Sequence, residues 1–130
     1  MKKKELKQKL GFHNITDNDI MYYAGVTEQM VMSTSRKREI VVARDIMMAN
    51  LWANTSATLT KVGATYWKDH ATIIHSIKKI NNALEGYNDD VLDLIKSIRS
   101  RNTITNQGID NGVNEMIALI NLESRMYERR

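Results

Sequence analysis

The sequence predicts an all-α protein, because it lacks proline, contains few glycines and repeats apolar residues at helical spacing. Its 130 residues include no proline and six glycines. These two residue types disfavour helix interiors most strongly, so their scarcity favours helices along the chain. The stretch 67–80 shows the spacing well, since Ile73, Ile77 and Ile80 fall on one side of a helix. The length suits one compact domain.

In the N-terminal part of the chain, the sequence predicts a helix with clear start and end signals, preceded by a basic segment. Residues 2–10 are basic and either form a short helix or fray at the terminus. Thr16 or Asp17 can accept a hydrogen bond from a free backbone N–H and so begin a helix that runs through Tyr23. Gly25 ends this helix, because glycine tolerates the left-handed conformation of a helix end.

Two further helices follow, the second of them long. Thr27 caps a short helix that extends to about Met32, with an acidic residue in its first turn. Ser33 or Ser35 is expected to cap a long helix over residues 36–54. Its expected buried face consists of residues spaced by three or four: Ile40, Ala43, Met47, Asn50 and Leu51.

The middle of the chain has the pattern of a helix-turn-helix. Thr58 caps a short helix with the sequence LTKVGATY, and a tight turn at residues 67–68 leads into a helix that starts near Asp69. We expect Trp67 to cover the core at this turn; a contact with DNA is the alternative. The second helix is apolar at Ile73, Ile74, Ile77, Ile80 and Leu84 and polar on the opposite face at Lys68, Thr72, His75, Ser76 and Lys79.

The C-terminal part differs in character and predicts two more helices. Asn88 caps a helix with an acidic start over residues 89–99, and a polar loop separates it from a last helix over residues 111–127. The chain is therefore expected to divide into three parts. They are a basic N-terminal segment (1–14), a helix-turn-helix domain (15–86) and a C-terminal helical extension (87–130).

Basic charge is concentrated in the middle third of the chain. Residues 34–82 contain eight Lys and Arg against three Asp and Glu, although the whole chain carries only +4. Three basic residues, Arg36, Lys37 and Arg38, come together at the expected start of the long helix. Positive charge there opposes the helix dipole by about 0.3–1 kcal/mol each, so an anionic partner would explain it. The distribution indicates binding to a polyanion.

The same stretch resembles a known family. The sequence SRKREIVVARDIMMANLWANTSATLTKVGATYWKDHATIIHSIKKI is similar to the C-terminal DNA-binding domain of the bacterial replication initiator DnaA, and the likeness covers about residues 15–82. Its specific features are the basic start with the following Ala-Arg, the spaced Leu-x-x-Val-Gly, and Asp-His-x-Thr-x-x-His at the start of the recognition helix. The resemblance implies double-stranded DNA as partner.

The resemblance also implies roles for individual residues. Arg36 corresponds to an arginine that enters the minor groove, whereas Arg44, Thr72 and Lys79 correspond to backbone contacts. The start of the recognition helix, from Lys68 onward, corresponds to the region that contacts bases and backbone. The complete set of candidate DNA-binding residues is Arg36, Lys37, Arg38, Arg44, Lys61, Lys68, Asp69, His70, Ala71, Thr72, His75, Lys78 and Lys79.

Several positions depart from the family pattern. Ala71 stands where the family usually has Thr or Ser, and it can make only apolar contact, for instance with a thymine methyl group. Tyr66-Trp67-Lys68 replaces a turn that commonly ends in Gly-Gly-Arg or Gly-Arg. Trp52 replaces a basic residue, and Asp45 replaces a glutamine. Binding of the family's standard DNA box is therefore not implied.

Other functional classes find little support in the sequence. There is no cysteine and no G-x-x-x-x-G-K-[ST] loop, so neither a thiolate metal site nor ATP hydrolysis is expected. His70 and His75 lie about 140° apart on a helix and are not expected to share a metal. Asp89, Asp90 and Asp93 are interpreted as an acidic first helical turn rather than a magnesium site. No cofactor and no enzymatic activity are expected.

Two functions remain open at this point. The first is a sequence-specific double-stranded DNA-binding protein that regulates replication or transcription, of host, phage or mobile-element origin. The second is an interaction module on the same fold that binds a replication protein. No signal peptide or membrane span is recognised, so a cytoplasmic, nucleoid-associated protein is expected. The apolar stripe of the last helix suggests homodimerisation through residues 88–127.

Overall fold

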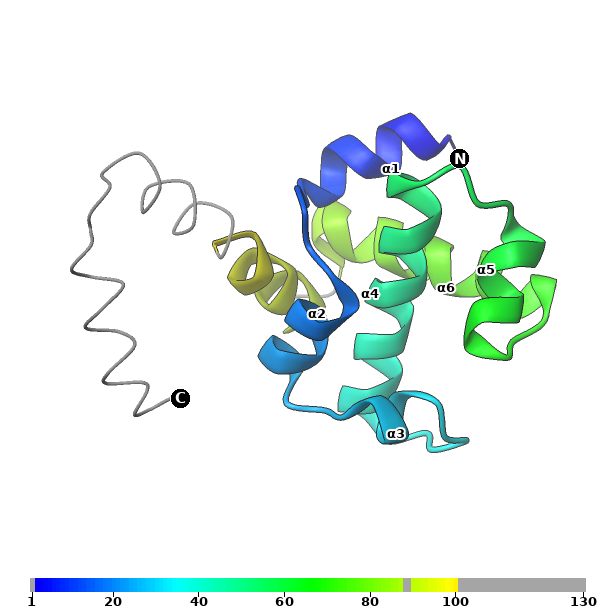
Figure 1. Cartoon of the computed structure of the whole chain (residues 1–130). Helices are drawn as coiled ribbons and strands as arrows, with labels where there is room; N and C mark the ends of the chain where they lie inside the picture. The colour runs from blue at the N-terminus through cyan, green and yellow to red at the C-terminus, as the bar shows by residue number, and fades with distance from the viewer. Residues whose placement is uncertain (1, 88–89, 101–130) are drawn as a thin grey trace. The chain divides into compact units, whose positions relative to one another are not determined.

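A computed structural model describes residues 2–87 and 90–100, and these residues form helices and no strands (Figure 1). The all-α prediction is therefore confirmed. Of the two expected C-terminal helices, the first is seen over residues 90–100. The second, over residues 111–127, and the expected cap Asn88 lie outside the described residues.

Helices α1 (Lys3–Leu10), α2 (Asp17–Ala24) and α3 (Glu28–Val31) form the N-terminal part. α1 does not fray, because Leu6 and Leu10 are fully buried in the core. The hydroxyl groups of Thr16 and Thr27 accept hydrogen bonds from the backbone N–H three residues later, each at 3.2 Å, and so cap α2 and α3 as predicted.

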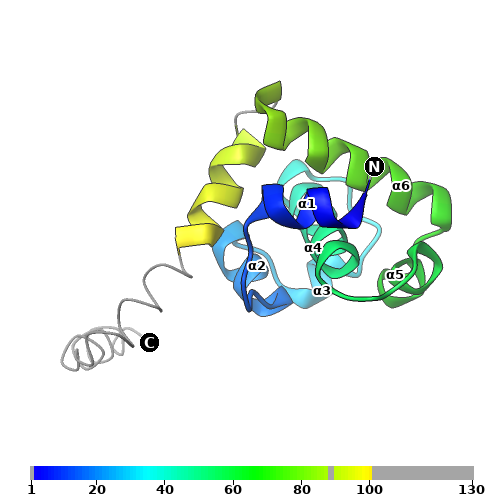
Figure 2. The same ribbon diagram turned by 90° about the horizontal axis from the view of Figure 1, so that it is seen from above.

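The long helix α4 (Arg38–Asn54) lies at the centre, and α1, α2, α3, α5 and α6 all contact it (Figure 2). Residues 43–50 are buried on every side, so the buried surface is wider than the predicted single face. The helix starts at Arg38 and not at residue 36. The Ser35 hydroxyl accepts a hydrogen bond from the Lys37 N–H at 3.2 Å and caps nothing in α4.

Helices α5 (Leu59–Tyr66) and α6 (His70–Asn82) follow as the predicted helix-turn-helix pair. Thr58 caps α5, and Asp69 caps α6 by accepting a hydrogen bond from the Thr72 N–H at 2.8 Å. α6 packs along α4 and α5 through Ile73, Ile77 and Ile80, which are at most 4 % exposed. This packing fixes the orientation of the opposite, exposed face of α6.

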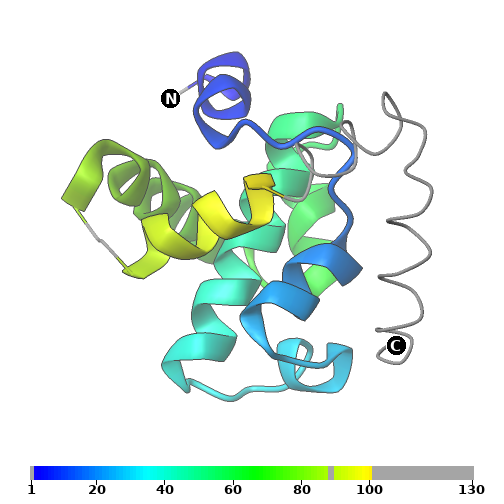
Figure 3. The same ribbon diagram turned by 90° about the vertical axis from the view of Figure 1, so that its left-hand side faces the viewer.

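The chain leaves α6 through a kinked turn, Ala83–Tyr87, in which Gly86 has a φ of 91°. The helix over residues 90–100 then returns to the body of the domain (Figure 3). Its residues Val91, Ile95 and Ile98 are at most 5 % exposed and belong to the same hydrophobic core as α1. One core therefore includes side chains from both segments that flank residues 15–86.

Candidate nucleic-acid interface

The turn between α5 and α6 is tight because glycine occupies position 63. The Lys68 N–H donates a hydrogen bond to the Gly63 carbonyl oxygen at 2.8 Å. A Cβ atom at position 63 would lie 2.5 Å from the Lys68 carbonyl oxygen, which is closer than real contacts allow. A side chain there would push the start of α6 away from α5. Gly63 therefore sets the relative position of the two helices.

Asp69 combines a structural and a chemical role at the start of α6. Its hydrogen bonds with the side chain and backbone of Thr72 hold the pKa of Asp69 below its usual value. The carboxylate is exposed and stays ionised at neutral pH. It can therefore cap the helix and still accept a hydrogen bond from a ligand, because a carboxylate oxygen has more than one acceptor site.

The predicted polar face of α6 is present with one correction. His70, Ala71, Thr72, His75, Lys78 and Lys79 are exposed. Ser76, which the helical geometry placed among the polar residues, is instead 3 % exposed and lies at the edge of the core. Ile74 in α6 and Leu84 in the kinked turn that follows it are half-buried rather than buried.

Trp67 does not cover the core, and this expectation was wrong. Its side chain is 75 % exposed, whereas the neighbouring Tyr66 is buried at 4 %. Tyr66, Val62 and Ile73 already fill the space beneath the turn. Trp67 itself has a left-handed backbone conformation (φ 58°, ψ 42°) at the end of α5. No pattern in the sequence distinguishes which of these two adjacent aromatic residues is buried.

The basic residues before α4 have different surroundings. Arg36 and Lys37 are exposed, and no hydrogen bond or ion pair ties either side chain among the residues that the structure describes. Arg38 instead makes two hydrogen bonds of 2.9 Å with the Asp90 carboxylate, from Nε and Nη2. The helix over residues 90–100 thus holds one of the three expected DNA-binding residues of this segment.

Arg44 has surroundings unlike those of the expected phosphate contact. It is only 7 % exposed. Its Nε donates to the Val31 carbonyl oxygen at 2.8 Å, and its Nη2 donates to the carbonyl oxygens of Ser33 and Ser35 at 3.2 and 3.3 Å. The guanidinium group therefore fastens the loop between α3 and α4. The position of Arg44 within the buried stretch of α4 could have indicated that its side chain contacts the protein rather than DNA.

Lys79 forms an ion pair of 2.9 Å with Asp45 of α4, whose side chain is only 8 % exposed. The pair explains why an acidic residue can occupy position 45 inside the domain: a buried charge requires a partner. The Lys79 side chain remains 45 % exposed, so its ammonium group can meet a second anion. Arg36, Arg38, Asp45 and Lys79 line a common hollow of about 230 Å³. The basic loop, which carries Arg36 and Lys37 between α3 and α4, and the second half of α6 therefore meet at one surface.

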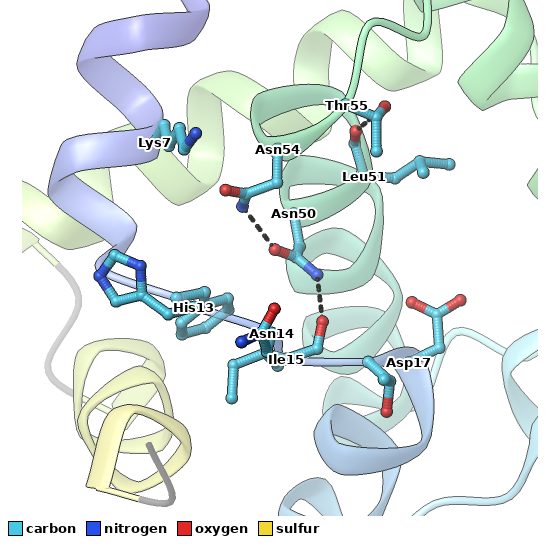
Figure 4. Close-up of a pocket in the computed structure, with 11 residues that line it drawn as sticks. Lys7, His13, Asn14, Ile15, Asp17, Asn50, Leu51, Asn54 and Thr55 are labelled. Carbon is cyan, nitrogen blue, oxygen red and sulfur yellow. Dashed lines mark hydrogen bonds between the residues drawn. The ribbon is translucent and has the colours of Figure 1, made fainter. Parts of the chain in front are cut away.

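A second hollow, of about 510 Å³, lies between α1, the linker after it and the C-terminal half of α4 (Figure 4). Asn54 Nδ2 donates to Asn50 Oδ1 at 2.7 Å, and Asn50 Nδ2 donates to the Ile15 carbonyl oxygen at 3.3 Å. The second of these bonds ties the linker to α4, and the first holds the Asn50 side chain in place. None of the thirteen candidate residues lines this hollow, so it is separate from the interface.

No group of three or more His, Asp or Glu side chains within residues 2–87 and 90–100 could hold a metal ion. Within the same ranges, no helix has both the length and the apolar character needed to cross a membrane.

Comparison with known proteins connects this geometry to a family. Residues 17–80 match the family described as "Bacterial dnaA protein helix-turn-helix". This range begins with α2 and ends within α6, and it includes the basic loop, α4 and the turn at Gly63. Residues 17–80 therefore form a bacterial DnaA helix-turn-helix domain.

Individual relatives agree with this assignment. The chain is 30 % identical over 82 residues to the chromosomal replication initiator protein DnaA 2 of Chlamydia caviae, which covers 60 % of this chain and 18 % of that protein. It is 31 % identical over 90 residues to DnaA 1 of Chlamydia trachomatis, covering 68 % and 20 %. The DnaA of Deinococcus radiodurans is 27 % identical over 77 residues, covering 59 % and 16 %. The matched region thus spans about a fifth of these curated relatives. No solved structure matches the chain significantly.

Proposed function

We propose that the chain binds double-stranded DNA in a sequence-specific manner and acts as a regulator of replication or transcription. The observation that carries this proposal is the exposed polar face of α6, which carries Lys78 and Lys79 and no carboxylate, on a DnaA helix-turn-helix domain, with the loop at Arg36 on the same side of the α4–α6 pair. In helix-turn-helix proteins the second helix enters the major groove with its N-terminal residues against base edges.

The start of α6 supplies groups suited to base recognition. The ionised Asp69 carboxylate can accept a hydrogen bond from the N4 amino group of cytosine. Ala71 offers a methyl group to thymine, and His70 and Thr72 offer polar atoms beside it. All four side chains are exposed, so none must leave a packed position in order to reach DNA.

Backbone contacts come from the surrounding cations. Lys37, Lys61 and Lys78 are exposed, and Lys68 is half-exposed. Each can neutralise one phosphate, which releases condensed counterions and makes binding salt-dependent. Arg36 is suited to the minor groove, where a narrow A·T-rich segment concentrates negative potential.

Selection of bound sequences from random duplex DNA, followed by fluorescence anisotropy at several salt concentrations, tests the proposal. We expect one enriched motif and a steep fall in affinity with salt, because each neutralised phosphate contributes a slope of about −0.9 in log K against log[salt]. Binding without an enriched motif would refute sequence specificity. Absence of binding at low salt would favour the alternative, an interaction module for a replication protein.

Substitution of Arg36 tests the minor-groove contact. We expect Arg36→Ala to weaken binding and to relax the preference for A·T pairs at one edge of the selected motif, because that preference comes from groove shape. Lys4→Ala, which removes one exposed charge from α1, is the control and should leave the motif unchanged. A motif that is identical for Arg36→Ala and the unmodified chain would exclude Arg36 from sequence recognition.

Self-association through residues 88–127 remains a proposal, and most of that segment lies outside the described residues. Within it, Val91, Ile95 and Ile98 are buried in the domain's own core and are not available to a second copy. Light scattering of the full chain, with and without DNA, tests the proposal. A monomeric mass at tens of micromolar under both conditions would refute it.

A further inference from the structure

Trp67 is a strongly exposed member of the helix-turn-helix turn, and neither packing nor capping explains its size. The indole is 75 % exposed at the end of α5. Its backbone is left-handed, a conformation that is costly for bulky residues and free of strain for glycine. Tryptophan is unfavourable at this position for two reasons, its left-handed backbone and its exposure to water. Its presence there suggests a contact outside the domain.

The position of Trp67 relates it directly to the recognition helix. It lies two residues before Asp69, the N-cap of α6, and is followed by the half-exposed Lys68. Residues 58–79 contain four lysines, Lys61, Lys68, Lys78 and Lys79, against one acidic residue, Asp69. An exposed aromatic side chain in basic surroundings matches a nucleic acid better than an apolar protein surface.

We propose that Trp67 is an additional DNA contact, with its indole ring against the deoxyribose and a thymine methyl group beside the bases read by α6. The Nε1–H can donate a hydrogen bond to a phosphate oxygen, since the indole combines an apolar ring with one donor. The inference rests on the proposed DNA binding and adds a contact at the tip of the turn.

The nature of this contact gives it a distinctive dependence on salt. An apolar contact releases no counterions, whereas each lysine–phosphate contact does. Loss of the indole should therefore reduce affinity by the same factor at every salt concentration. Loss of a contacting lysine should reduce affinity most at low salt and make the slope shallower.

The variant Trp67→Gly tests the contact without endangering the fold, because glycine adopts the left-handed conformation freely. We expect a melting temperature equal to or above that of the unmodified chain, a roughly tenfold weaker affinity for the selected duplex, and an unchanged salt slope. Trp67→Asn, a second residue that tolerates this conformation, should behave alike. Tyr22→Ala is the matched control: its ring is 79 % exposed on α2, which contributes no candidate residue, and affinity should not change.

Fluorescence provides an independent measurement. The chain has two tryptophans, so Trp52→Phe leaves Trp67 as the only one. Anisotropy of labelled duplex reports binding by this variant, and tryptophan emission reports the surroundings of Trp67. We expect saturating duplex to change the emission and to protect the indole from acrylamide quenching.

The outcomes separate the inference from the proposed function. No change in anisotropy for the unmodified chain would refute DNA binding itself. Normal binding with unaltered Trp67 emission, together with wild-type affinity of Trp67→Gly, would refute the contact and leave DNA binding intact. A shallower salt slope in Trp67→Gly would show that Trp67 acts by positioning Lys68. A lower mass of Trp67→Gly in light scattering would assign the indole to a contact between two copies.

Discussion

Asp17 and Tyr66 form a polar contact that joins two helices of the domain. The Tyr66 hydroxyl group donates a hydrogen bond of 2.8 Å to Asp17 Oδ2, which connects the end of α5 with the first turn of α2. Burial raises the pKa of Asp17, and the negative charge of Glu28 raises it further. The hydrogen bond from Tyr66 lowers the pKa, but the net shift is upward. Burial and the charge of Asp17 likewise raise the pKa of Tyr66.

The raised pKa of Asp17 predicts a pH-dependent stability. The folded state binds this proton more tightly than the unfolded state, so the contribution of Asp17 is fully present below its unfolded pKa. It is lost as pH rises through the raised folded pKa. We expect the free energy of unfolding of the unmodified chain, relative to that of Asp17→Asn, to fall over this window and then to level off. Urea denaturation of both proteins from pH 4 to pH 8 measures it.

Tyr66→Phe provides a companion test of the same contact. Removal of the hydroxyl group removes the bond that lowers the pKa of Asp17, so the step should move to higher pH. A step that stays in place in this variant would contradict the lowering of the Asp17 pKa by Tyr66. A difference from Asp17→Asn that rises with pH would contradict the upward shift by burial.

At the scale of secondary-structure elements, the start of a helix could be predicted from the sequence wherever neighbouring residues make the cap. Thr16, one of the two candidate caps of α2, and the predicted caps Thr27 and Thr58 all cap their helices, because each bond joins residues three apart. Asp69, predicted to lie near the start of α6, caps that helix in the same way. The start of α4 was predicted two residues too early. Ser35 bonds the N–H two residues later, a competing local geometry that the sequence pattern does not distinguish from a cap.

The surroundings of an individual side chain could be found only from the tertiary structure and not from the sequence. Arg44 and Lys79 were both predicted as backbone contacts, yet one is buried under a loop and the other is paired with a buried carboxylate. Arg44 bonds residues 9 to 13 positions away in sequence. No periodicity reveals such partners, although the helix that carries Arg44 was correctly identified.

Arg44→Lys distinguishes a positioning residue from a phosphate contact. Lysine keeps the charge but lacks the planar fork that reaches three carbonyl oxygens. If Arg44 positions the loop, this variant should lose about 1–3 kcal/mol in unfolding free energy, because buried carbonyl groups lose their partners, and should bind DNA more weakly. Arg36→Lys, at an exposed position, should change stability by less than about 0.5 kcal/mol. Unchanged stability and affinity in Arg44→Lys would favour the direct phosphate contact.

At the scale of the whole domain, the two segments outside residues 15–86 meet each other. Arg99 donates hydrogen bonds to the carbonyl oxygens of Lys9 and Leu10 at 2.6 and 2.7 Å, at the C-terminal end of α1. Lys9 also forms an ion pair of 2.9 Å with Glu85. These contacts join residues 76 to 90 positions apart, so composition and spacing could not predict them. They show that α1 and the helix over residues 90–100 belong to the domain structurally.

This arrangement places Asp90 against Arg38 at the start of α4, where the two side chains form an ion pair of 2.9 Å. DNA phosphates would compete with Asp90 for the same guanidinium group. Both side chains are more than half exposed, so the pair is worth about 0–1 kcal/mol and can be displaced. The extension therefore weakens DNA binding slightly rather than preventing it, if Arg38 contacts DNA.

Asp90→Asn tests this competition. The variant removes the negative charge that pairs with Arg38 in this contact, so affinity for the selected duplex should rise by up to about fivefold, the equivalent of 1 kcal/mol, and the salt slope should steepen by up to about one phosphate. Asp93→Asn removes the same charge from an exposed position on the same helix and serves as the control. Anisotropy titrations at matched salt compare the two. An equal rise in both variants would attribute the effect to net charge. No rise in Asp90→Asn would show that Arg38 remains outside the DNA interface even when Asp90 no longer holds it.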